Sequence, residues 1–482
     1  MTGPAPAPQT HMYKLLLSLP LILASISGCA RYQVKPLQPE TRLAEFKARS
    51  LADPALIGYM NASLRSPVVL PKSRWELPAL TLVAFYYHPE IELARARAAG
   101  IQAAVATANQ RANPNFSFGT TLETPFQDTL PWILTPALDL LFERASERRS
   151  RTAQADRLAS AARWDIGATA WEVRSRLNVR LTDHVFAVRE SELLREEEAI
   201  RAEYFSSLQT RLALGDISRL DVEASRIELQ RVRLQLNVVE GRVSETRAAL
   251  PEALGIPAGT LSNLEFHEPR LENPIQLTED QLRTLESDAL LNRVDIYRVL
   301  EQYAAAEAAL QMQIAAQRPN FSLGPAFRWR EGQQRWTLGL SFELPVFNRN
   351  EGPIAEAEAA RETTARDFDR LQASVVADVE QASASYRAAI GQRRSAVDLN
   401  AAAADRLAGI QQLFDLREVD YMIVLAARLE VALAKRADLL ALRKLHAALA
   451  MIEDAIQRPL GDEFSMPNNL ELRPNHATVR NP

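Results

Sequence analysis

The sequence of 482 residues contains one cysteine, Cys29, and only 17 glycines. A single cysteine excludes an intramolecular disulfide bond. The net charge is −4, and basic residues alternate with acidic ones along the chain. This pattern argues against nucleic acid as a partner, because neutralising phosphates requires a concentrated basic surface.

The sequence also lacks the motifs of common enzymes. It has no Gly-x-x-x-x-Gly-Lys-Ser/Thr loop for a nucleotide, so any energy must come from a partner protein. It has no Gly-x-Ser-x-Gly turn of a serine hydrolase either. The six histidines are scattered, with no helical pair at the spacing of metal ligands. We therefore expect no enzymatic activity, no cofactor and no metal site.

The N-terminal residues are typical of a secreted lipoprotein. Lys14 precedes an apolar run over 15–26, which is too short for a membrane-spanning helix but has the length of a secretory signal. Residues 26–29 (ISGC) resemble a bacterial lipoprotein cleavage site, which implies a signal peptide over 1–28 and acylation of Cys29. Ala30 follows, and in such lipoproteins this residue implies sorting to the outer membrane. The alternative is an ordinary signal peptide followed by a buried cysteine.

Two motifs occur twice at long spacing. Residues 114–119 (PNFSFG) return as 319–324 (PNFSLG), and the pattern of 214–226 returns over 416–428. A period of about 200 residues is too long for a solenoid, whose repeats span about 20 to 50 residues. We interpret it as a duplicated half-molecule. The predicted segments are a signal peptide, a tether and equatorial segment, a first repeat, a linker, a second repeat and a polar tail: 1–28, 29–75, 76–256, 257–278, 279–458 and 459–482.

Each half is predicted to contain a helix, two strands, a long helix, a turn and a returning helix. The first half has helices over 77–112, 143–214 and 218–254 and strands over 114–123 and 132–142. The second has helices over 279–317, 353–416 and 421–457 and strands over 320–330 and 335–346. Pro353 fits the first position of its helix, where a missing N–H costs nothing.

The predicted strands alternate between apolar and polar side chains, which is the period of a strand. With about ten residues each they resemble strands of a membrane barrel. The apolar residues expected to face lipid are Phe321, Leu323, Phe327, Trp329, Trp336, Leu338, Leu340 and Phe342. Four strands cannot close a barrel, whereas three chains supply twelve strands without a free edge. This argument predicts a homotrimer, although a small soluble sheet with one buried face gives the same alternation.

The predicted helices are too long for a globular core, since about 70 residues span on the order of 100 Å. The helix over 218–254 has two apolar stripes, so it can contact a neighbour on each side, as in the wall of a cylinder. Ordinary bundle packing is the alternative for any one helix. The predicted fold is therefore mainly α-helical, with a twelve-stranded transmembrane barrel and a helical periplasmic tunnel formed by a trimer.

The order of these motifs resembles the TolC family of outer-membrane channels. The residues that carry the resemblance are the two Pro-Asn-Phe-Ser motifs, the turn at 214–222 and the passage over 342–352. The passage over 342–352 resembles the same passage in channels of this family that are attached to heavy-metal exporters, such as CzcC and CusC. The resemblance covers nearly the whole mature chain. It implies a trimer in the outer membrane whose helices meet a periplasmic adaptor and an inner-membrane transporter of the RND type.

The resemblance also implies roles for the two helical turns. They would contact the adaptor and open like an iris through Gly215, Asp216, Ser218, Arg417, Glu418 and Asp420. Asp221 and Asp420 are the candidates for an acidic pore constriction. The family's turn glycine is replaced by Arg417, and the position that matches Asp221 is Ile423. An alternative role for these carboxylates is helix capping, because acidic groups stabilise a helix N-terminus.

The predicted function is passive export of small solutes, either metal cations or drugs. Residues 348–350 (NRN) favour metal cations weakly. The alternatives are a periplasmic coiled-coil structural lipoprotein and an outer-membrane duct for protein secretion.

Overall fold

The computed structural model describes residues 32–63, 74–122, 132–261, 264–266, 268–330 and 332–461. The predicted signal peptide, Cys29 and nearly all of the predicted polar tail lie outside the described residues. Within the described ranges, no helix has an apolar stretch long enough to cross a membrane.

The chain divides into two units between Ala48 and Arg49. Among its described residues, the first unit contains helix α2 (Pro39–Lys47), which buries no side chain. Pro39 begins this helix, at a position where a missing N–H leaves no hydrogen bond unmade.

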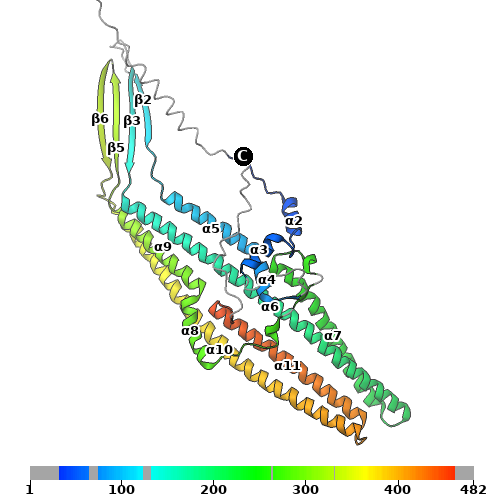
Figure 1. Cartoon of the computed structure of the whole chain (residues 1–482). Coiled ribbons are helices and arrows are strands. Elements are labelled where there is room, and N and C mark those ends of the chain that lie inside the picture. The colour runs from blue at the N-terminus through cyan, green and yellow to red at the C-terminus, as the bar shows by residue number, and fades with distance from the viewer. Residues whose placement is uncertain are drawn as a thin grey trace, which may run out of the picture. The chain divides into compact units, whose positions relative to one another are not determined.

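In the second unit the same order of elements occurs twice (Figure 1). The first series is α4 (Leu77–Tyr87), α5 (Pro89–Ala108), β2 (Asn115–Leu122), β3 (Trp132–Phe142), α6 (Ala145–Leu214) and α7 (Arg219–Leu254). The second is α8 (Glu279–Asn292), α9 (Val294–Ala316), β5 (Phe321–Arg330), β6 (Gln333–Phe342), α10 (Glu351–Asp415) and α11 (Tyr421–Ile456). The remaining elements are α3 (Pro54–Ser63), β1 (Arg74–Trp75), β4 (Glu265–Phe266) and the short 3-10 helices η1 (Ala258–Leu261) and η2 (Pro269–Leu271).

The long helices have the predicted lengths. Helix α6 has 70 residues and α10 has 65, so α6 spans about 105 Å at 1.5 Å per residue. Within the second unit, Figure 1 shows the four long strands at one end of these helices and the α6–α7 and α10–α11 turns at the other.

Two predicted helices are each interrupted. The helix predicted over 77–112 breaks at His88 and ends at Ala108. Pro89 explains the break, because a proline forces the preceding residue out of the helical region. The helix predicted over 279–317 breaks at Arg293, although no proline follows. There the extended backbone places the Arg293 guanidinium against Asp295 and the carbonyl oxygen of Ala455.

Two predicted elements had wrong boundaries. Helix α10 begins at Glu351, so Pro353 occupies its third position and not its first. The N–H groups of the whole first turn lack partners within a helix, so proline is tolerated there as well. Strand β6 covers 333–342 instead of 335–346, and Pro345 cannot donate to a strand ladder.

The four long strands form one antiparallel sheet in the order β2-β3-β5-β6. Its register pairs Phe142 with Phe321 and Phe321 with Phe342. Within the described chain, β2 and β6 are edge strands with a partner on one side only. A second, short sheet consists of the parallel pair β1 and β4.

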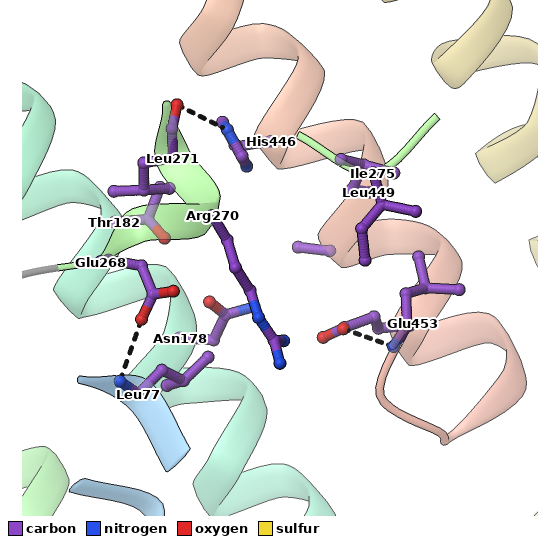
Figure 2. A pocket seen from close by; sticks show the side chains of 12 residues that line it. Leu77, Asn178, Thr182, Glu268, Arg270, Leu271, Ile275, His446, Leu449 and Glu453 are labelled. Carbon is purple, nitrogen blue, oxygen red and sulfur yellow. Dashed lines mark hydrogen bonds between the residues drawn. The ribbon is translucent and has the colours of Figure 1, made fainter. Parts of the chain in front are cut away.

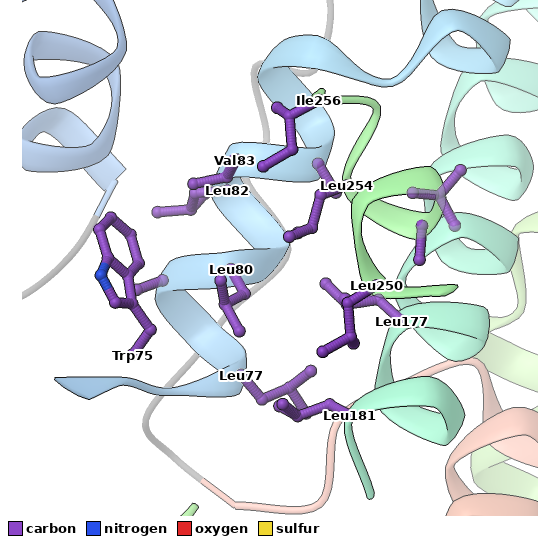
Figure 3. Close-up of a cluster of buried hydrophobic side chains, with 14 of the residues drawn as sticks. Trp75, Leu77, Leu80, Leu82, Val83, Leu177, Leu181, Leu250, Leu254 and Ile256 are labelled. Carbon is purple, nitrogen blue, oxygen red and sulfur yellow. The ribbon is translucent and has the colours of Figure 1, made fainter. Parts of the chain in front are cut away.

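The main hydrophobic core surrounds α4 (Figure 3). All residues of α4 except Pro78 are buried. Leu77, Leu80 and Leu82 lie among side chains from three other segments, which include Trp75, Leu177, Leu181, Leu250, Leu254 and Ile256. This core joins α4 to the middle of α6 and to the C-terminal end of α7. A second core joins α8 and α9 to α10 and α11.

Candidate functional site: the sheet and the two helical turns

Among the described residues, nothing covers the apolar face of the four-stranded sheet. Trp336 is 75% exposed and Leu338 is 68% exposed. Register places them on the same face as Phe327 and Phe321, and the rings of Phe327 and Trp336 lie 4.8 Å apart. The residues predicted to face lipid therefore share one face. An exposed apolar surface of this size is typical of contact with another protein or with a membrane.

Strands β2 and β3 extend this apolar face. Phe116 and Phe118 are 65% and 59% exposed, and Phe116 pairs with Leu138 on the same face. The sequence analysis did not include these two aromatic residues among the site residues. Their alternation with Ser117 and Gly119 in residues 114–119 is the signal that identifies them.

The opposite face of the sheet carries small and polar side chains. On β5 and β6 these include Ser322, Gly324, Thr337, Gly339 and Ser341. A sheet with one face buried in a soluble core would leave only one face open. Here both faces lack a covering helix among the described elements.

The turn between α6 and α7 is closed by backbone geometry and by a capping box. Gly215 ends α6 with φ +83°, a conformation that glycine adopts without strain. The hydroxyl of Ser218 accepts a hydrogen bond from the backbone N–H of Asp221 at 3.3 Å. In return, the Asp221 carboxylate accepts a hydrogen bond from the backbone N–H of Ser218 at 3.2 Å. Asp221 thus caps the start of α7, as the capping alternative predicts.

The turn between α10 and α11 has the same form with different residues. Arg417 has φ +63°, the left-handed conformation that Gly215 adopts in the first turn. The Asp420 carboxylate accepts the Met422 backbone N–H at 3.0 Å and caps α11. Asp221 and Asp420 therefore both stabilise helix N-termini.

Side-chain contacts tie the two turns together. Asp420 also forms an ion pair with Arg211 near the end of α6. The hydroxyl of Tyr421 donates to Glu203 of α6 at 2.6 Å. The sequence analysis did not identify Arg211, Glu203 or Tyr421. No local pattern points to them, because each contact joins residues more than 200 positions apart in the sequence.

A small cavity of about 60 Å³ lies where the segment between the two series of elements passes α4, α6 and α11 (Figure 2). The Glu268 carboxylate accepts the Leu77 backbone N–H at 2.9 Å at the start of α4. Burial raises the pKa of Glu268. His446 contacts the carbonyl oxygen of Leu271 at 3.2 Å, and burial lowers its pKa to about 4. These contacts anchor the connecting segment.

No metal centre is found among the described residues, where no three His, Cys, Asp or Glu side chains gather. His88 caps α5 by accepting the Glu90 N–H at 3.3 Å. His184 lies 3.1 Å from the Thr246 hydroxyl. Burial lowers the pKa of both histidines, as expected for structural side chains. His11, His267 and His476 lie outside the described residues.

The sequence matches no model of a known protein family and no curated protein. Its structure, however, matches solved structures of outer-membrane proteins. The VceC outer membrane protein of Vibrio cholerae aligns at 17% identity and a TM-score of 0.63, over 79% of this chain and 95% of VceC. The CmeC outer membrane channel of Campylobacter jejuni aligns at 16% identity and 0.61, over 79% of this chain and 85% of CmeC.

CusC, whose solved structures concern transmembrane channel formation, aligns at 15% identity and a TM-score of 0.58, over 79% of this chain and 92% of CusC. At identities this low, the alignments establish the fold. The aligned proteins CmeC and CusC are described as outer-membrane or transmembrane channels. The chain therefore has the mainly helical fold of the TolC family of outer-membrane channels, which its sequence motifs resemble.

Proposed function

We propose that this chain is the outer-membrane duct of a tripartite efflux system. One observation carries the proposal: a four-stranded sheet with an apolar face, a polar face and two edges that no described strand pairs lies at the ends of long paired helices. Such a sheet completes its edges when three copies close into a twelve-stranded barrel, and lipid then covers the apolar outer face. The helices then form a tunnel beneath it.

In this proposal the apolar side chains of the strands contact lipid. Residues 1–28 are a signal peptide, and acyl chains on Cys29 tether the segment that follows to the periplasmic leaflet. The barrel, whose strands contact lipid across the hydrocarbon layer, supplies a second anchorage that does not depend on these acyl chains. The two halves, 76–256 and 279–458, act as structural repeats.

The α6–α7 and α10–α11 turns are the proposed contact sites for the partner proteins. Gly215, Asp216, Ser218, Arg417, Glu418 and Asp420 meet a periplasmic adaptor that links the duct to an inner-membrane transporter of the RND type. Asp221 and Asp420 are the candidates for a constriction. Because both carboxylates already cap helices, a constriction built on them also affects the stability of the turns.

The cargo is a small solute that the transporter selects, either a metal cation or a drug. A strain that lacks the gene, challenged with zinc, cobalt, copper, dyes and antibiotics, identifies the class. Sensitivity to metals alone supports the metal branch of the family, and sensitivity to organic compounds alone excludes it. A defect in protein secretion alone would replace efflux with the secretion alternative.

Membrane insertion of Cys29→Ser tests the duct itself. Because the barrel provides the anchorage, we expect the variant to remain in carbonate-washed outer membranes as a trimer and to conduct ions in planar bilayers. Extraction of Cys29→Ser as a soluble monomer would instead support the periplasmic scaffold.

A further inference from the structure

Three of the six tryptophans of the chain lie on the four-stranded sheet. Trp132 begins β3, Trp329 lies near the end of β5, and Trp336 lies near the start of β6. These positions are at the end of the sheet that lies away from the helices (Figure 1). Register and the alternation of side chains place all three on the apolar face. They are here called the tryptophan row.

The same three strands carry phenylalanine at the helical end of this face. Phe142, Phe321 and Phe342 are paired in register there. Their rings are wholly apolar, whereas the indole of tryptophan combines an apolar body with an N–H donor. Apolar side chains even continue beyond β6, where Leu344 and Val346 are each 66% exposed. The helical end of the face therefore suits hydrocarbon alone, and the opposite end suits a boundary between hydrocarbon and polar groups.

The tryptophan row crosses the strands diagonally. Trp329 lies two residues farther from the helices than Phe327, which is opposite Trp336. Trp132 lies two residues farther than Leu134, which is opposite Trp329. Barrel strands tilt by about 40°, so a level line shifts by about 4 Å, or a little more than one residue, from each strand to the next. Since side chains of one face recur every second residue, a step of two residues is the nearest that a level row can take.

The apolar band below the tryptophan row has the height of a membrane. Strand β3 runs over 11 residues from Trp132 to Phe142. These two positions are about 33 Å apart along the strand, or about 25 Å along the axis of a barrel with strands tilted by about 40°. On the same face, the apolar side chains from Trp336 to Val346 cover an equal number of positions. The hydrocarbon layer of an outer membrane requires an apolar band about 25 Å tall with aromatic residues at its borders.

We propose that the tryptophan row lies at the outer boundary of the membrane, between the acyl chains and the polar groups of the lipids, and fixes the depth at which the duct sits. This inference rests on the proposed function, since only a closed barrel turns the apolar face toward lipid. Lipid is the occupant because the row is level and the apolar band below it has membrane height. Each indole ring contacts acyl chains there and directs its N–H toward polar groups.

Quenching of tryptophan fluorescence by brominated phosphatidylcholines tests this depth. Purified wild-type trimers are reconstituted into vesicles whose lipids carry bromine either close to the headgroup or near the end of the acyl chains. We expect the shallow bromines to quench the emission roughly twofold or more strongly than the deep ones. Trp75, Trp164 and Trp171 lie outside the four-stranded sheet, so neither lipid should quench them. The triple variant with Trp132→Phe, Trp329→Phe and Trp336→Phe should lose most of the quenching by lipid.

The matched probe is Leu340→Trp in the background of the triple variant. Leu340 lies on the same face of β6, four residues from Trp336 toward the helices, or about 10 Å deeper along the axis. At this position we expect the deep bromines to quench more strongly than the shallow ones.

The measurement on wild-type protein requires no variant to fold. Wild-type trimers that remain in carbonate-washed membranes, but that the deep bromines quench equally or more strongly, would overturn the inference while leaving the duct intact. Inserted trimers that neither lipid quenches would do the same. Protein that never inserts would overturn the duct, and the inference with it.

Discussion

The side-chain oxygen Oε1 of Gln457 accepts a hydrogen bond from the backbone N–H of Val294 at 3.0 Å. Gln457 follows α11 with φ +48°, and Val294 begins α9. At the corresponding positions of the first half, Gly255 follows α7 with φ +68° and Pro89 begins α5. Proline has no N–H to satisfy, and glycine has no side chain with which to satisfy one. The first half thus has no backbone N–H to satisfy at this junction, whereas the second half satisfies one with a side chain. Two different residue pairs fulfil the same hydrogen-bonding requirement.

Recreating the first pair in the second half tests this compensation. We expect Gln457→Ala to destabilise by about 1 kcal/mol, because the Val294 N–H loses its partner. The double variant with Val294→Pro and Gln457→Gly should be more stable than the sum of its single variants predicts, because proline removes the unsatisfied donor. Denaturant unfolding of wild type, Val294→Pro, Gln457→Gly and the double variant forms a double-mutant cycle. This cycle measures the coupling energy between the two positions. Strict additivity would show that the two positions act independently.

Gly255 is constrained by its neighbours as well as by its backbone. A Cβ atom there would lie 2.8 Å from the Cα of His88 and 2.8 Å from the carbonyl oxygen of Tyr87. We expect Gly255→Ala to destabilise by about 3 kcal/mol or more, since strain and overpacking combine. Gly215→Ala is the control, because Gly215 has φ +83° but a Cβ atom there would meet nothing within 4 Å. We expect this variant to lose about 1 kcal/mol of folding stability from backbone strain alone. Similar losses of folding stability in Gly255→Ala and Gly215→Ala would show that the close contact with Tyr87 and His88 has no effect.

Arg417 occupies a left-handed position that suits glycine. Arg417→Gly should stabilise the α10–α11 turn by up to about 1 kcal/mol, because a non-glycine residue costs about that much in this conformation. Arg417→Ala serves as control, since it removes the side chain but retains the strain. The melting temperatures of Arg417→Gly, Arg417→Ala and wild type distinguish an effect of the backbone from an effect of the side chain. If both variants shift the melting temperature equally, the side chain and not the backbone determines the effect.

His446 makes stability depend on pH. Its pKa is lowered from 6.5 to about 4 by burial, so between these values the unfolded chain binds more protons than the folded one. Stability is therefore complete above about pH 6.5 and is lost as the pH falls toward 4, by up to about 3 kcal/mol. His446→Gln retains a donor for Leu271 but does not titrate. Its unfolding free energy should fall less steeply between pH 6.5 and 4 than that of wild type, and an identical slope would assign the acid sensitivity to other groups.

The contacts between the two turns should hold the tunnel closed if the proposed duct opens at its tip. Tyr421→Phe removes the hydrogen bond to Glu203, and Arg211→Gln removes the ion pair with Asp420. Together they should raise single-channel conductance in planar bilayers without altering trimer yield. Arg387→Ala, which breaks the exposed pair with Glu279 away from the tip, should not. Unchanged conductance in the double variant would indicate that these contacts serve stability alone.

Regular periodicity made most of the fold predictable. The strands around Phe321 and Trp336 alternate strictly, and α6 and α7 meet at a turn marked by Gly215 and Ser218. The break at Arg293 was not predictable, because it depends on the Ala455 carbonyl, which is 162 residues distant. The contacts of Arg211 and Tyr421 were missed for the same reason: they depend on where α6 and α11 lie in space.

The two edges of the sheet that no described strand pairs affect how a newly made chain behaves before assembly. Strands β2 and β6 each present a row of backbone donors and acceptors next to exposed aromatic rings, a template to which any extended segment can add. In the proposed trimer these edges pair with strands of the neighbouring copies, so before assembly every encounter with a partly folded chain competes with the pairing that closes the barrel.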